Sequence, residues 1–275
     1  MINGTKLDLF KKEYPNDVYD VGIAEEHAAA MAAGFALLEK PVCLIMYSTF
    51  SQRAYDIFLN DIARQNLKVI IGIDRSGIVG EDGSTHQGIY DVAMFGSMPN
   101  IKIAMPIDAY ETQALFDYAF KQTNPMVIRY PRGKSSMLSP ITIVDESWNY
   151  LIDDAENEVC VISYGSDLLR IMDIVKNNNL KVSVLNARFI KPIDKLAVNN
   201  LKRFKGVLIY EQVVKDNSLG SKIIYQLNIE RINIKVKHLA IDCDTIVTYG
   251  DIKTILQRYG LGDDAIYEEI MNLCD

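Results

Sequence analysis

The chain has 275 residues, 49% of them hydrophobic and 24% charged, which is typical of a folded globular protein long enough for two domains. Its 29 Lys and Arg residues against 36 Asp and Glu residues give a net charge of -7, so a protein that binds by neutralising nucleic-acid phosphates is disfavoured. No apolar run approaches the roughly 20 residues that span a bilayer, and the N-terminal segment has no apolar signal-peptide core. We therefore expect a cytoplasmic protein with no membrane partner.

Along the chain, β-type runs alternate with helical runs, the pattern of βαβ units. The N-terminal half predicts strands at 41–48, 67–74, 101–105 and 125–130, and helices at 25–38, 51–65 and 109–122. A break in this rhythm predicts a linker over 133–158 with room for one short strand. The C-terminal half predicts strands at 159–165, 181–189, 206–211 and 236–241, and helices at 167–177, 193–203, 217–229, 250–259 and 263–273. The sequence thus predicts an α/β protein of two domains, 1–132 and 159–275, each a mainly parallel sheet with helices on both faces.

The first informative segment is VGIAEEHAAAMAAGFALL, residues 21–38. Glu25 and Glu26 stand at the start of a helix of small residues. Taken alone they indicate no more than a helix start, because acidic side chains in a first turn complement the helix dipole.

The second segment, YSTFSQRAYDIFLND, covers residues 47–61 and passes from a strand into a helix. Ligands of open α/β sheets bind at the carboxyl ends of strands, where Tyr47, Phe50 and Arg53 fall. An aromatic ring at this place could stack on a heterocycle. Tyr55 and Phe58 are interpreted as core residues of the helix instead.

The third segment, DRSGIVGEDGSTHQG, covers residues 74–88 and is a long glycine-rich loop. Its glycine spacing fits neither a dinucleotide-binding nor a P-loop motif, and no obvious helix begins at its end. Loops of this length without secondary structure are uncommon unless they are functional. Arg75, Asp82 and His86 are therefore candidate functional residues.

The fourth segment, RYPRGKSS, ends a buried-type strand with Arg129 and Arg132. Two guanidinium groups at a strand's carboxyl end suit a phosphate or a carboxylate. For Arg129, a surface salt bridge is an equally good interpretation.

These four segments, in this order, resemble the pyrimidine-binding domain of 1-deoxy-D-xylulose-5-phosphate synthases. NARFIKPID (186–194) and VLIYEQ (207–212) are similar to the C-terminal domain of that family. Transketolases and the beta subunits of 2-oxo acid dehydrogenases share the two-domain plan. The STFSQRAYD and RYPRG segments favour the synthase.

The resemblance implies thiamine diphosphate as the cofactor and a transferase that condenses pyruvate with glyceraldehyde 3-phosphate, with loss of CO2, for isoprenoid and thiamine precursor supply. Glu25 would be catalytic by hydrogen-bonding N1′ of the aminopyrimidine. Phe50 would stack on that ring, and Arg53 would lie beside it.

The resemblance also implies a substrate channel, with His86 as a second catalytic residue. Arg75 and Arg132 would hold the substrate phosphate, while His86 and Asp82 would bind its hydroxyl and carbonyl groups. Tyr47 would complete the lining.

The chain departs from the family in lacking its Gly-Asp-Gly and Asn motif, so we expect no metal site here and Mg²⁺ on a separate N-terminal domain. The family's pyrimidine-binding domain normally begins one strand before Met1, and a sheet without that strand would expose its edge. We therefore expect a complementing N-terminal domain or subunit, a homodimer, and no activity of the isolated chain. Two alternatives are a split transketolase or 2-oxo acid dehydrogenase beta-like subunit, and a non-catalytic dimerisation or assembly module.

Overall fold

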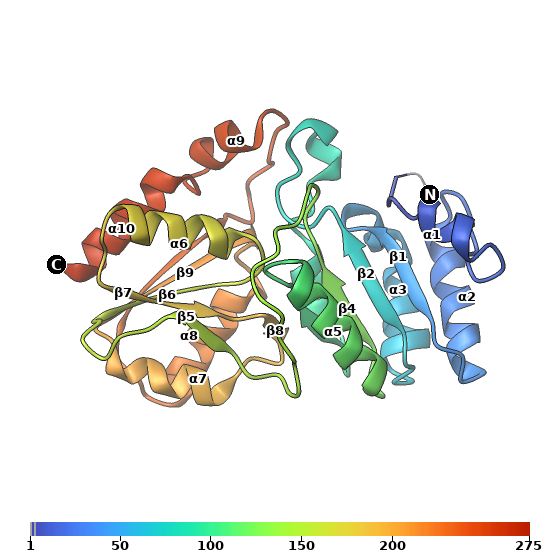
Figure 1. The fold of residues 1–275 in the computed structure, drawn as a ribbon, viewed down its shortest axis with the longest axis horizontal. Coiled ribbons are helices and arrows are strands. Elements are labelled where there is room, and N and C mark those ends of the chain that lie inside the picture. The colour runs from blue at the N-terminus through green and yellow to red at the C-terminus, as the bar shows by residue number, and fades with distance from the viewer. Residues whose placement is uncertain (1, 3) are drawn as a thin grey trace.

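The chain folds around two five-stranded sheets in a computed structural model that describes residues 2 and 4–275 (Figure 1). The first sheet has the order β1 (Cys43–Tyr47), β2 (Ile70–Asp74), β4 (Met126–Arg129), β3 (Lys102–Ala104) and β8 (Phe189–Lys191). The second sheet has the order β10 (Lys235–Ile241), β9 (Gly206–Val214), β6 (Val159–Ser163), β7 (Val182–Asn186) and β5 (Asn149–Ile152). All pairings are parallel except β3 with β8 and β5 with β7. The predicted α/β class is confirmed.

Helices cover both faces of each sheet (Figure 1). Around the first sheet, α5 lies on one side and α2 and α3 lie on the other. Around the second sheet, α6 and α10 lie on one side and α7 and α8 on the other. The helices are α1 (Asp8–Glu13), α2 (Glu25–Leu37), α3 (Tyr55–Ile57), α4 (Asp91–Gly96), α5 (Ala109–Lys121), α6 (Asp167–Asn177), α7 (Lys195–Asn200), α8 (Leu219–Ile229), α9 (Ile252–Arg258) and α10 (Asp263–Cys274).

Continuous apolar runs place the central strands inside the protein. Every residue of β2, β4, β6 and β7 is buried, as expected for parallel strands covered on both faces. Several helices begin at an acidic cap: Asp108 accepts from the Glu111 amide before α5, and Asp251 accepts from the Thr254 amide before α9. The sheets are therefore rigid supports for the loops at their strand ends.

The helix predicted over 51–65 has three different parts. A 3₁₀ helix, η1 (Thr49–Ala54), leads into α3 and then into a π-helical turn, η2 (Phe58–Ala63). Ser51 Oγ donates to Ser48 O at 2.6 Å, which holds the tight turn of η1. Departures from α-helical winding of this kind are frequent at functional sites.

The strand predicted over 181–189 is divided in two. After β7 the chain leaves the second sheet, and β8 pairs antiparallel with β3 of the first sheet through Ile103 with Lys191 and Ala104 with Phe189. The predicted linker contributes β5 to the second sheet. The two sheets are thus joined by strand pairing as well as by the chain between them.

The glycine-rich loop also differs from expectation, because α4 begins shortly after its end and the loop contains two short 3₁₀ turns, η3 (Gly80–Asp82) and η4 (Ser84–His86). The start of α4 escaped the sequence pattern because Tyr90, which precedes it, makes no side-chain cap.

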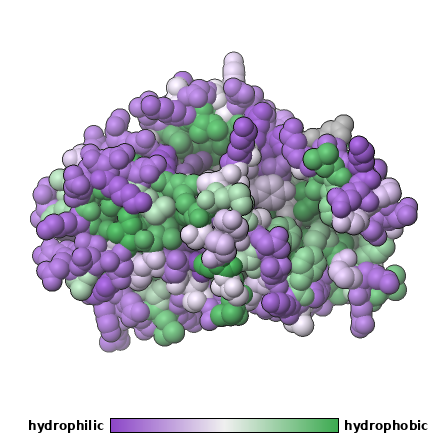
Figure 2. All heavy atoms as spheres, in the orientation of Figure 1, coloured by the Kyte–Doolittle hydropathy of each residue, from purple (hydrophilic) through white to green (hydrophobic). Residues whose placement is uncertain are grey.

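Hydrophilic side chains predominate around the rim of the face in Figure 2, and hydrophobic side chains gather over the second sheet. In the part of the chain that the structure describes, no helix combines the length and apolar character needed to cross a membrane.

Candidate active site

The predicted site residues lie at the carboxyl ends of adjacent strands of the first sheet. Tyr47 ends β1, Asp74 ends β2, and Arg129 ends β4, with the three strands paired in parallel. The loops that follow these strands carry η1, the glycine-rich segment and Arg132. This edge is where open α/β sheets bind ligands.

Glu25 is the first residue of α2 and is only 6% exposed. Small buried residues on α2, Ala29 and Ala33 among them, allow that helix to pack closely. Among the described residues, Glu25 Oε2 has no hydrogen-bond partner, and Arg53 Nη1 lies 3.5 Å from it. Arg53 Nε lies equally far, 3.5 Å, from Oε1 of the half-buried Glu26. Oε2 of Glu25 is thus a buried carboxylate oxygen with an ion-pair neighbour in Arg53 but no hydrogen bond among the described residues.

The rings of Tyr47, Phe50 and His86 form a row next to α2, the helix that begins at Glu25. The Tyr47 and Phe50 rings stack with centroids 5.6 Å apart, and the Phe50 and His86 rings meet edge to face at 5.2 Å. The Arg75 guanidinium lies 3.8 Å from the centroid of the Tyr47 ring. Burial raises the pKa of Tyr47, and the charge of Arg75 opposes that rise. The structure thus brings together four residues that the sequence predicted to share a site.

Asp82 joins the two arginines that were predicted to bind phosphate. Its Oδ2 accepts from Arg75 Nε at 2.7 Å, and its Oδ1 accepts from Arg132 Nη1 at 2.8 Å. Arg75 also donates to Asp74 Oδ2 at 2.9 Å. Burial raises the pKa of Asp74, and the charge of Arg75 opposes that rise. An incoming anion would therefore compete with Asp82 for both guanidinium groups.

Two backbone hydrogen bonds join the beginning and the end of the glycine-rich loop. Gly77 N donates to Gly88 O at 2.7 Å, and Gly88 N donates to Gly77 O at 2.8 Å. A Cβ atom on Gly88 would lie 2.0 Å from the Arg75 carbonyl oxygen, so only glycine fits. Thr49 Oγ1 donates to Thr85 O at 2.8 Å and holds the loop beside η1. The loop is therefore a packed structure that fixes where its side chains point.

Arg129 belongs to a different environment from the one expected. It is 1% exposed, and its Nε and Nη2 donate to the two carboxylate oxygens of Asp91 at 2.7 and 3.0 Å. The surface salt bridge predicted as an alternative is wrong, because the pair is buried. Arg129 thus holds α4 against β4, and its Nη2 also donates to Gly88 O, at the end of the glycine-rich loop, at 3.5 Å.

The sequence missed three polar residues that support the site. Asp74 anchors Arg75, while Gln87 and Gln212 accept from backbone amides of the glycine-rich loop. Gln87 and Gln212 lie inside segments that the resemblance covered, and the signal that could have found them is a glutamine among buried apolar neighbours. Such a side chain needs partners, and here they are amides.

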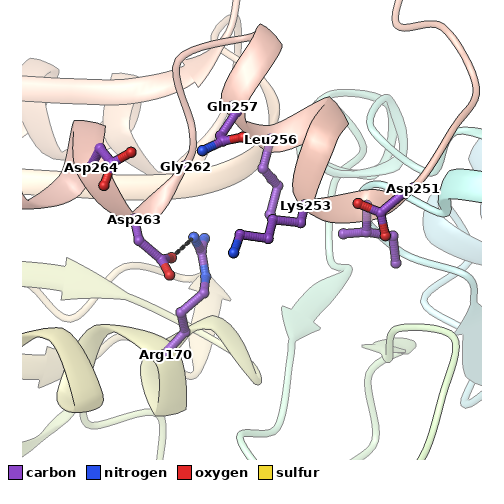
Figure 3. A pocket seen from close by; sticks show the side chains of 9 residues that line it. Arg170, Asp251, Lys253, Leu256, Gln257, Gly262, Asp263 and Asp264 are labelled. Carbon is purple, nitrogen blue, oxygen red and sulfur yellow. Dashed lines mark hydrogen bonds and ion pairs between the residues drawn. The ribbon is translucent and has the colours of Figure 1, made fainter.

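A separate hollow of about 530 Å³ lies in the C-terminal half (Figure 3). Its walls come from α6, α9 and the start of α10, with Arg170 donating to Asp263 across it. None of the predicted site residues lines it. Within residues 2 and 4–275, no group of three or more His, Cys, Asp or Glu side chains is placed to hold a metal ion.

Comparison with known families identifies both halves of the chain. Residues 1–136 match the family model for the transketolase pyrimidine binding domain, and residues 149–266 match that for the transketolase C-terminal domain. The chain belongs to the transketolase family.

Among curated proteins, the chain resembles enzymes named 1-deoxy-D-xylulose-5-phosphate synthase, and it spans less than half of their length. It is 36% identical to the protein of Clostridium tetani, over 99% of this chain and 45% of that protein. It is 39% identical to the protein of Macrococcus caseolyticus, over 98% of this chain and 44% of that protein. The resemblance to this family, inferred above from six segments, is confirmed.

Solved structures show the same fold. A structure described as a split gene transketolase, inactive beta4 tetramer, aligns with a TM-score of 0.84 at 24% identity, over 98% of this chain and 88% of that one. A transketolase from Campylobacter jejuni aligns with a TM-score of 0.72 at 19% identity, over 91% of this chain and 39% of that one. At these identities the likeness concerns the fold.

Proposed function

We propose that this chain provides the pyrimidine-binding and C-terminal parts of a thiamine-diphosphate-dependent transferase that condenses pyruvate with glyceraldehyde 3-phosphate to 1-deoxy-D-xylulose 5-phosphate, with loss of CO2. The observation that carries the proposal is Glu25, a buried carboxylate with one oxygen, Oε2, that has no hydrogen-bond partner among the described residues. A buried polar atom of this kind indicates a missing partner.

The residues present fit the aminopyrimidine end of that cofactor. Oε2 of Glu25 would share a proton with a ring nitrogen, and Phe50, on the 3₁₀ helix that packs against α2, would offer its ring face. Arg53, 3.5 Å from Glu25, would keep the carboxyl group oriented. Thiamine diphosphate, when bound, supplies the nucleophilic carbon that attacks a 2-oxo acid.

The same group of residues fits a phosphorylated acceptor. Arg75 and Arg132 converge on one carboxylate, Asp82, which occupies the place between the two guanidiniums that a phosphate would take. His86, held against Phe50, would lie between the cofactor end and the phosphate end and would hydrogen-bond the acceptor's oxygen atoms. In this proposal, substrate specificity would depend on Arg132 and on the glycine-rich loop that carries Arg75 and His86.

The diphosphate and Mg²⁺ would be held by a complementing domain or subunit that these 275 residues do not contain. The relatives are more than twice as long as the matching region. β1 is an edge strand, and large apolar side chains are exposed nearby: Leu9 76%, Ile23 64%, Leu37 61% and Leu38 70%. Surfaces of this kind mark sites of association, so the proposal includes a partner and a homodimer.

Thiamine diphosphate binding tests the proposal. Calorimetry with Mg²⁺ on the chain alone, and on the chain mixed with the N-terminal domain of a related synthase, should show heat of binding only in the mixture. Absence of binding in both cases would contradict the enzyme assignment and favour an assembly module. With the mixture active, pyruvate decarboxylation captured by glyceraldehyde 3-phosphate is expected, whereas ketol transfer from a ketose phosphate would identify a transketolase.

Association is tested separately by size-exclusion chromatography. The proposal expects a dimer or larger assembly at micromolar concentration. A stable monomer would contradict the predicted homodimer without affecting the cofactor assignment.

A further inference from the structure

The glycine-rich loop that carries Asp82 and His86 is anchored on its far side by residues of the C-terminal half. Its backbone contacts β9 and the connection between β10 and α9. The best-defined of these anchors is Gln212, on β9, which is 134 residues away from Ile78 in the sequence.

Gln212 uses both ends of its amide. Its Oε1 accepts from the backbone N–H of Ile78 at 3.1 Å, and its Nε2 donates to Asp167 Oδ1 at 2.8 Å. The fit is close, since a Cβ atom on Gly77 would lie 3.2 Å from Gln212 Oε1. Gly77 also has a φ of +84°, which favours glycine.

A second anchor supports the next turn of the loop. Gln87 Oε1 accepts from Val79 N at 3.0 Å, and Gln87 Nε2 donates to Thr248 O at 3.0 Å. Gly80 O accepts from Gly250 N at 3.3 Å, so two successive parts of the loop rest on the C-terminal half. The loop's position is therefore set by both halves of the chain.

Asp167 fixes the orientation of the Gln212 amide because it is itself held from the other side. Arg170 Nη2 lies 3.4 Å from Asp167 Oδ1, and Arg170 Nη1 donates to Asp263 Oδ1 at 2.6 Å (Figure 3). A carboxylate held in this way accepts from the Nε2 end of Gln212 and leaves Oε1 directed at Ile78. The wall of the hollow in Figure 3 is thus connected by hydrogen bonds to the loop.

We propose that Gln212 is a positioning residue: it holds the loop so that Asp82 and His86 stand opposite Arg132 and Phe50. Its action on turnover rests on the proposed function, but its action on the loop does not. Without Gln212, the buried Ile78 amide loses its acceptor, and the loop gains freedom to leave its position.

Hydrogen–deuterium exchange of the full chain tests the loop directly. Gln212→Met keeps the side-chain length and removes both hydrogen bonds. It should raise exchange in peptides covering 78–88 by roughly tenfold, as expected for the loss of one hydrogen bond of about 1.4 kcal/mol. Gln113→Met, on the exposed face of α5, is the matched control and should leave these peptides unchanged.

A double variant that swaps the amide of Gln212 and the carboxylate of Asp167 distinguishes loss of loop positioning from a general loss of stability. In the double variant Gln212→Glu with Asp167→Asn, the carboxylate can accept from the Ile78 amide and from the new Asn amide, so both contacts and the total charge return. Loop exchange should then fall back toward the value of the unaltered protein. Gln212→Glu alone should stay elevated, because it sets two carboxylates together.

If Gln212→Met leaves hydrogen exchange of the loop unchanged, the inference is overturned. It is also overturned if hydrogen exchange rises along the whole of β9 and the double variant does not reverse that rise. In the complemented enzyme, kcat should fall about tenfold in Gln212→Met and recover in the double variant, in step with the exchange data. An active enzyme with unaltered kcat in Gln212→Met would also overturn it. If neither the unaltered protein nor any variant is active, the proposed function fails. The hydrogen-exchange data still decide the role of Gln212.

Discussion

The carboxylate of Asp82 accepts a 2.7 Å hydrogen bond from Nε of Arg75. Asp82 also accepts a 2.8 Å bond from Nη1 of Arg132, so one acidic side chain is shared by two basic ones at the candidate site. Asp82 therefore competes with anions for these two arginines, and anion binding can be measured on the chain alone.

Asp82→Asn should strengthen binding of inorganic phosphate by roughly tenfold, because the competing charge is removed while both guanidiniums remain. Calorimetric or NMR titration of the chain with phosphate measures the change. Glu81→Gln is the matched control, since it removes the same charge from an exposed neighbouring position. Adding Arg132→Ala to Asp82→Asn should abolish the gain, and a persistent gain would place the phosphate elsewhere.

Glu25→Gln should lower turnover of the complemented enzyme by roughly 10²-fold or more, because the amide cannot share a proton with the ring nitrogen. Glu26→Gln is the matched control: its carboxylate also lies 3.5 Å from Arg53, but it is 47% exposed. A steady-state assay of both variants measures how much turnover each one loses. Equal losses would show that charge beside Arg53 matters and that the buried oxygen of Glu25 does not.

Arg129→Met should lower the free energy of unfolding by about 3–5 kcal/mol, because it leaves Asp91 buried without its partner. Urea unfolding measures the change. The double variant Arg129→Met with Asp91→Leu should recover part of the loss, since no charge is then left unpaired. Lys205→Met, which breaks the exposed ion pair with Glu158, serves as control and should change stability by less than about 1 kcal/mol.

Lys222, on α8, gives the protein a pH dependence in the alkaline range. Burial, and then the charge of Lys191, lowers the pKa of Lys222 from 10.5 to about 8. Between these two pH values the unfolded chain holds a proton that the folded chain has released, so stability rises with pH in that window. Lys222→Met should therefore stabilise the protein by roughly 2 kcal/mol at neutral pH, with a gain that shrinks above pH 8.

Urea unfolding at about pH 7 and about pH 9.5 measures that gain. Exposed Lys202→Met is the control and should show no such trend. A stabilisation by Lys222→Met that is equal at both pH values would show that lost packing or chain entropy, and not the buried charge, governs the site.

Apolar runs were sufficient to predict the parallel strands, and the resemblance to a known family was sufficient to group Tyr47, Phe50, Arg75 and His86. They were insufficient for Gln212 and for β8. The partner of Gln212 is an amide 134 residues away, and periodicity carries no information about contacts at that distance.

The nature of the helix after Tyr47 could not be predicted for a different reason. Apolar spacing predicts a helical face, but the 3₁₀ winding of η1 depends on the Ser51 hydroxyl bonding to the Ser48 carbonyl. The different surroundings of Arg129 and Arg132 could not be predicted either. Arg129 ends β4 and Arg132 lies three residues further on, and only the buried ion pair with Asp91 distinguishes Arg129.

The strand β8 sets a limit on how this protein can be divided or recombined. A break in the segment between β4 and β5 would give an N-terminal piece in which β3 keeps β4 but has lost β8. The backbone amides and carbonyls on that side of Ile103 and Ala104 would then be open to any extended chain. Such a piece would be expected to aggregate during expression. C-terminal halves can be exchanged between relatives, in the laboratory or in evolution, only under one condition. The incoming half must bring a segment equivalent to Phe189–Lys191 that pairs with β3 of the recipient's first sheet.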